Sequence, residues 1–99
     1  MTDVSDVLGP VNVTITMPRG PFVILWKTRD FLLDHVRPMA RAARIVAEFD
    51  NAGASRPVVL ESNERGMLHG ILDEWARAAG GNQRLPEGIW ALRRELAYE

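Results

Sequence analysis

The residues whose types and spacing come closest to a reactive group are His69, Asp73 and Glu74. In a helix, a four-residue step places His69 beside Asp73 on one face. A carboxylate next to an imidazole can orient the ring for proton transfer, and His35 could supply a second metal ligand. The favoured interpretation is a boundary histidine paired with a carboxylate, because His69 lies at the edge of an apolar stripe. We therefore predict no catalytic residue, no metal site and no cofactor.

The sequence also gives little support to covalent catalysis or to a phosphate-binding loop. The chain has no cysteine, and its serines are Ser5, Ser55 and Ser62. None of these serines stands in a glycine-flanked nucleophile elbow, and the glycines lack the lysine that a phosphate-binding loop needs. The sequence predicts a protein that is not an enzyme.

Arg37, Arg41 and Arg44 form a row at steps of four and three residues. Residues 19–44 carry six basic and two acidic side chains, although the whole chain has a net charge of −1. Such a row could dock on an acidic protein or follow a phosphate backbone, while a solvated polar helix face is the plainer alternative. The negative total argues against a general affinity for polyanions.

Three tryptophans are many for a chain of 99 residues. Trp75 falls on the apolar face of its segment and is predicted to lie in the core. Trp90 points aside from the apolar line of its own segment, and an exposed tryptophan is a common anchor at protein interfaces. The strand that contains Trp26 could leave an edge to which another chain adds. The predicted partner-binding residues are Arg37, Arg41, Arg44 and Trp90.

One segment, Ser62–Gly81, combines a start signal, a helical period and a stop signal. Its apolar residues recur at three- and four-residue steps. Ser62 is the predicted N-cap and Glu64 complements the helix dipole in the first turn. The pair Gly80-Gly81 ends the helix, since glycine adopts the left-handed conformation common at helix C-termini.

Strict alternation predicts a half-buried strand over residues 11–17. Phe22–Lys27 is rich in β-branched and aromatic residues and is predicted to form a hairpin with it, although the same residues could begin a helix. Val58–Glu61, after Pro57, is predicted to be a third strand.

A long helix is expected from Thr28, as its cap, to about Asn51. Pro38 either kinks this helix or separates two helices, because proline removes a backbone hydrogen bond and clashes with the preceding turn. The last helix is expected from Pro86, in its first turn, to about Ala97.

Together these segments predict a flexible tail over residues 1–10 and a single α+β domain over residues 11–99. The expected order is strand, strand, helix, strand, helix, helix, with a small antiparallel sheet covered on one face by two or three helices. The predicted core comprises Val13, Ile15, Leu25, Leu32, Val36, Met39, Val46, Val59, Leu68, Ile71, Leu72, Trp75, Ile89 and Leu92.

These observations predict a small non-enzymatic module that binds another protein or itself as a homodimer, in a regulatory or accessory role. The expected setting is the cytoplasm of a bacterium or its phage, since the sequence has neither a secretory signal nor an apolar run of membrane-spanning length. The alternative is a nucleic-acid-binding regulator that uses the arginine row. No small-molecule substrate is inferred.

Overall fold

A computed structural model describes residues 12–86 and 88–97. The predicted tail over residues 1–10 lies outside these ranges. The elements are β1 (Asn12–Thr16), β2 (Phe22–Leu25), α2 (Trp26–Val36), the 3-10 helix η1 (Ala40–Ala42), α3 (Ala43–Ala52), β3 (Val58–Val59), α4 (Ser62–Ala79), the 3-10 helix η2 (Asn82–Arg84) and α5 (Ile89–Leu96). The α+β architecture and the order of strands and helices agree with the prediction.

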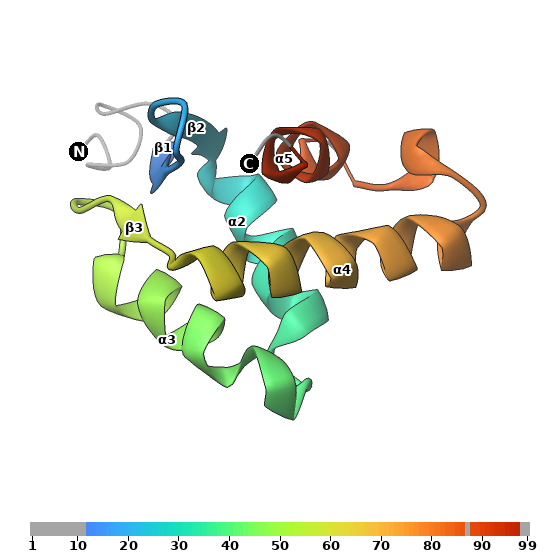
Figure 1. Cartoon of the computed structure of the whole chain (residues 1–99), viewed down its shortest axis with the longest axis horizontal. Helices are drawn as coiled ribbons and strands as arrows, with labels where there is room; N and C mark the ends of the chain where they lie inside the picture. The colour runs from blue at the N-terminus through green and yellow to red at the C-terminus, as the bar shows by residue number, and fades with distance from the viewer. Residues whose placement is uncertain (1–11, 87, 98–99) are drawn as a thin grey trace, which may run out of the picture.

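The three strands form one sheet in the order β2-β1-β3, which lies at one end of the molecule (Figure 1). β1 pairs with β2 as an antiparallel hairpin, closed by the Pro18-Arg19-Gly20 turn. β3 pairs with β1 in parallel. The prediction of a purely antiparallel sheet is therefore wrong, because α2 and α3 carry the chain back before β3 starts, which is the connection that parallel neighbours require.

Both interpretations of Phe22–Lys27 hold in part. The strand ends at Leu25, and α2 begins at Trp26 with no loop between them. Thr28 is consequently a buried residue of the first turn and not the cap of the helix.

Pro38 separates two helices instead of kinking one. α2 ends at Val36, and the chain turns through Arg37 and Pro38 into η1 and α3. Pro38 has no amide hydrogen to donate, so α2 cannot continue through it. The chain turns here instead, and the turn is closed by a hydrogen bond from the Met39 amide to the Val36 carbonyl at 2.9 Å.

The segment with the clearest sequence signals becomes α4, the longest helix, which runs away from the sheet (Figure 1). Its N-cap is Glu61 and not Ser62. The Glu64 carboxylate accepts a hydrogen bond from the Glu61 amide at 2.8 Å, as in one half of a capping box. Gly80, at φ 98°, ends the helix as predicted.

The last helix starts later than predicted. Pro86 lies before α5 and its carbonyl accepts from the Ile89 amide at 3.1 Å, whereas Gly88 is the N-cap at φ 86°. A Cβ at Gly88 would come within 2.5 Å of the Thr28 Oγ1 atom, so this glycine lets α5 approach the first turn of α2.

The helices and the inner face of the sheet enclose one apolar core, centred on Phe49, Leu68, Leu72, Ile89 and Leu92. Most predicted core residues are buried, and Met39 and Trp75 pack against the core while partly exposed. The prediction that Leu25 and Val59 belong to the core is wrong. They are 44% and 57% exposed, because the neighbours Ile24 and Val58 occupy the inward positions of their strands.

Among the described residues, no helix combines the length and the apolar character that crossing a lipid bilayer demands.

Candidate functional site

The predicted arginine row does not exist as one helix face. Arg37 caps α2, Arg41 lies in η1 and Arg44 lies in α3, because the chain turns at Pro38 between them. The structure places the three side chains in different surroundings.

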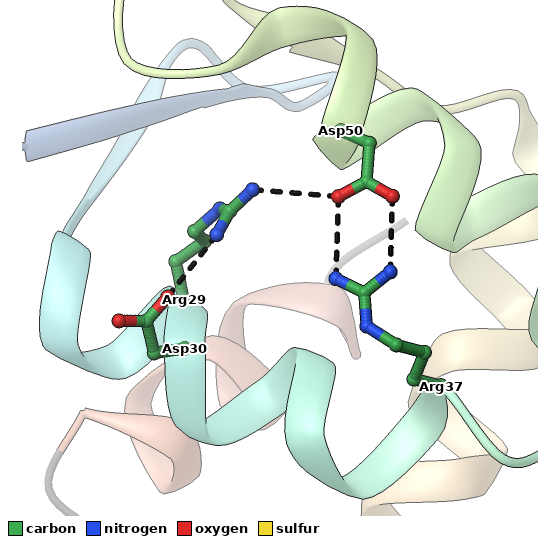
Figure 2. Close-up of polar contacts among 4 residues, drawn as sticks. All are labelled: Arg29, Asp30, Arg37 and Asp50. Carbon is green, nitrogen blue, oxygen red and sulfur yellow. Dashed lines mark hydrogen bonds and ion pairs between the residues drawn. The ribbon is translucent and has the colours of Figure 1, made fainter.

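Arg37 belongs to an ion-pair cluster that joins α2 to α3 (Figure 2). Its guanidinium donates to both carboxylate oxygens of Asp50, at 3.0 and 3.3 Å. Arg29 approaches the same carboxylate at 3.5 Å and also pairs with Asp30 at 3.1 Å. The hydrogen bond from Arg37 lowers the pKa of Asp50, and that bond likewise raises the pKa of Arg37. Two arginines and two aspartates leave the cluster neutral, so it ties helices together and offers no free cation.

Arg41 is similarly occupied. It donates to the Glu74 carboxylate of α4 at 2.7 Å, and this hydrogen bond lowers the pKa of Glu74. Arg44 is exposed on α3 and has no ion pair with any other described residue.

His69 is partly buried, as predicted for a boundary histidine, but the ion pairs of the neighbouring Asp73 are formed with arginines. Asp73 forms an ion pair with Arg93 of α5. It forms a second ion pair, at 2.8 Å, with Arg77, which lies four residues further along α4. The hydrogen bond from Arg93 is the main cause of the lowered pKa of Asp73. Within residues 12–86 and 88–97 no group of three or more His, Cys, Asp or Glu side chains converges as a metal site.

His35 contacts α4 through an aromatic side chain. Its ring stacks on Trp75 with centroids 3.7 Å apart, and burial lowers its pKa. The ring of His35 is thus in contact with a helix other than its own.

Trp90 is 40% exposed on α5, as its position in the sequence predicts. The Arg94 guanidinium lies 5.0 Å from the centroid of its ring. One face of the indole is thus in contact with a cation of its own helix.

Three of the exposed large apolar side chains in the described part of the chain, Val23, Leu25 and Val59, lie on the outer face of the sheet. In β1, Asn12, Thr14 and Thr16 point away from the core, as their alternation with buried Val13 and Ile15 requires. The strand register pairs these outward residues with apolar neighbours in the order Asn12 with Leu25, Thr14 with Val23, and Thr16 with Val59. We call these six residues the outer sheet face.

No member of the outer sheet face is charged, and its three large apolar side chains are about half exposed. Val23 is 54%, Leu25 44% and Val59 57% exposed. Val23 and Leu25 lie on the same side of β2, and Val59 lies on β3, across the polar outward side chains of the central strand β1.

A shallow cleft of about 160 Å³ borders this face beside β3. Val59 and Pro57 line it from the strand side, and Glu48, Asn51 and Ala52 line it from α3. Arg56 lines it as well and donates to the Asn51 carbonyl at 2.6 Å.

Comparison of the chain with protein-family models, with curated proteins and with solved structures finds no match. The candidate site is therefore argued from the geometry of this chain.

Sequence reasoning missed the outer sheet face because it assigned Leu25 and Val59 to the core. A signal was available in the period of two. Once Val13 is inward, its hairpin partner Ile24 must be inward too, and Val23 and Leu25 must point outward. The outward position of Val59 could not be derived in this way, because the sequence does not show which strand pairs with β3.

Proposed function

We propose that the protein is a small non-enzymatic interaction module, regulatory or accessory in role, which binds another protein through the outer sheet face. The observation that supports it best is the alignment of Val23, Leu25 and Val59 on one uncharged face. A cytoplasmic location is part of the same proposal.

The physical reason is the hydrophobic effect. Fully burying a valine or leucine side chain contributes about 1.5–3 kcal/mol relative to leaving it exposed. These three side chains are about half exposed, so a partner that covers them gains roughly half of that amount at each. Thr14 and Thr16, on the central strand, can hydrogen-bond with a partner without the desolvation cost of a buried charge.

The arginine row gives less support to the alternative of nucleic-acid binding. Arg37 and Arg41 already pair with Asp50 and Glu74. A phosphate would have to displace these carboxylates, whereas a protein partner on the outer sheet face displaces only water.

The test compares the full-length chain with two surface variants. Val23→Lys places a charge on the β2 side of the outer sheet face, and Met67→Lys places the same charge at an exposed apolar site on α4. Each is immobilised and exposed to host extract, and captured proteins are then purified and titrated against the labelled chain.

We expect a partner that binds wild-type and Met67→Lys alike, is lost from Val23→Lys, and shifts the resonances of Val23 and Val59. Sedimentation of the pure chain measures self-association in the same samples. A partner that binds Val23→Lys as tightly as wild type, or the absence of any partner together with a monomeric chain, contradicts the proposal.

A further inference from the structure

The cleft between α3 and β3 has two opposite charges in its lining that do not pair with each other. Glu48 lines the cleft from α3, and Arg56 lines it from the segment that leads into β3. Within the part of the chain that the structure describes, the Glu48 side chain forms no hydrogen bond and no ion pair. Its carboxylate is therefore available to a ligand.

Arg56 is held in place at the end of α3. Its Nη2 atom donates to the Asn51 carbonyl at 2.6 Å, and its amide donates to the Ala52 carbonyl at 3.2 Å. The last carbonyls of a helix lack partners within the helix, so these bonds satisfy two of them. A guanidinium has five N–H donors in one plane, and the bond to Asn51 restrains the orientation of the others. Donors that are restrained before a ligand arrives reduce the entropy that binding costs.

The remaining residues of the cleft restrict the size of a ligand. Ala52, Pro57 and Val59 give the cleft an apolar lining. Its volume of about 160 Å³ is below the range of about 300–1,000 Å³ that is usual for the sites of drug-sized molecules. The cleft therefore suits a small molecule with a short apolar part.

The two charges restrict the chemistry of that molecule. A cation bound at Glu48 alone would be repelled by Arg56, and an anion bound at Arg56 alone would be repelled by Glu48. A neutral apolar molecule would remove water from both charges without replacing their hydrogen bonds, which is unfavourable. A molecule with one ammonium group and one carboxylate group satisfies both side chains.

From the charges and the size together we infer that the cleft binds a small zwitterion, a free α-amino acid with a short apolar side chain. The ammonium group of the ligand pairs with the Glu48 carboxylate, and its carboxylate accepts hydrogen bonds from the Arg56 guanidinium. Its side chain lies on the apolar lining. This inference does not depend on the proposed protein-binding function, since neither charged residue belongs to the outer sheet face.

NMR titration of the full-length chain with L-valine and two of its derivatives tests the inference. At about pH 6, L-valine has both charges, L-valinamide has only the ammonium group, and N-acetyl-L-valine has only the carboxylate. We expect L-valine to shift the resonances of Glu48, Asn51, Arg56 and Val59 with a dissociation constant in the millimolar range. Each derivative lacks one of the two charge pairs and should bind about tenfold more weakly.

Two substitutions test the role of each charge. Glu48→Gln should weaken the binding of L-valine about tenfold but should not weaken that of N-acetyl-L-valine. Arg56→Gln should weaken the binding of both, and circular dichroism reports whether the lost bond to Asn51 disturbs α3. Glu48→Gln removes no hydrogen bond or ion pair to a described residue, so it tests the inference even if Arg56→Gln misfolds. Arg44→Gln, on the same helix but outside the lining of the cleft, is the control and should bind L-valine as the wild type does.

Several outcomes would overturn the inference. Binding of either derivative as tightly as L-valine would mean that the cleft recognises one charge alone. An unchanged affinity of Glu48→Gln for L-valine, shifts confined to residues outside the cleft, or no saturation up to about 100 mM L-valine would also contradict it. Capture of a partner protein at the outer sheet face is a separate measurement, so the failure of one proposal is distinguishable from the failure of the other.

Discussion

The imidazole of His35 stacks on the indole of Trp75 with centroids 3.7 Å apart and planes inclined by 6°. His35 lies in α2 and Trp75 in α4, so this contact joins two helices that flank the core. Both rings are partly buried, which gives the contact a consequence for the pH dependence of stability.

Burial lowers the pKa of His35 below its ordinary value of 6.5. The unfolded chain therefore binds more protons than the folded chain just below pH 6.5, and the stability due to the neutral ring is lost as the pH falls through the folded pKa. We expect the free energy of unfolding to decline as the pH falls below 6.5, and His35→Gln to flatten this decline.

Urea titrations at a series of pH values measure the decline. His69→Gln, which retains the stacked ring, is the control for the replacement of a histidine elsewhere in the chain. A slope that is the same with and without His35 would contradict the role of the stack.

The ion-pair cluster makes a separate prediction at lower pH. Because the hydrogen bond from Arg37 lowers the pKa of Asp50 below 3.8, the cluster contributes stability above that value and loses it as the pH falls through the folded pKa. We expect Asp50→Asn to lower the melting temperature slightly at pH 7, and to reduce the difference between the melting temperatures at pH 7 and pH 3. Glu48→Gln, on the same helix but outside the cluster, is the control for the replacement of an acidic side chain on α3.

Leu72 is fully buried on α4, and truncation there leaves a cavity. Leu72→Ala is expected to lower the free energy of unfolding by about 2–5 kcal/mol. Met67→Ala removes an exposed side chain from the same helix and should change it by less than about 0.5 kcal/mol. Chemical denaturation measures both, and equal losses would show that α4 does not pack as described.

A side chain at a positive-φ position can destabilise the fold through backbone strain and through a steric clash, and substitutions at Gly80 and Gly88 distinguish the two effects. They have φ values of 98° and 86°, but a Cβ at Gly80 meets open space whereas one at Gly88 meets Thr28. Gly80→Ala should cost about 1–2 kcal/mol from the left-handed backbone alone.

Gly88→Ala should cost about 1–3 kcal/mol more than Gly80→Ala, since the new methyl group must displace the Thr28 side chain. A double-mutant cycle with Thr28→Ala checks the cause, because removal of the threonine should recover part of the additional loss. Equal costs at the two glycines would mean that α5 does not approach α2 closely.

The sequence was sufficient for elements whose signals are local. The alternation of residues 12–17 and the glycine stop after Ala79 depend only on neighbouring residues, and the structure has both. The cap of α4 shows the limit, because Ser62 is of a type preferred at the N-cap, yet the structure places the cap at the adjacent Glu61. The reach of Glu64 back to the Glu61 amide distinguishes them in the structure.

Features that depend on distant parts of the chain could not be predicted. The row of Arg37, Arg41 and Arg44 requires a continuous helix, and Pro38 left two possibilities open. The outer sheet face requires knowledge of which strand lies beside β1, and Val59 is placed there by a parallel pairing that follows two intervening helices. Local patterns contain no information about that neighbour.

The parallel pairing of β3 with β1 also determines when the outer sheet face comes into being. The hairpin of β1 and β2 joins near neighbours in sequence, but Val59 meets Thr16 only across a loop that contains all of α2 and α3. Closing such a loop is entropically costly until the intervening helices have packed. We therefore expect nascent or partly folded chains to lack the complete surface, so that a partner bound at the proposed site would distinguish folded chains from incompletely folded ones.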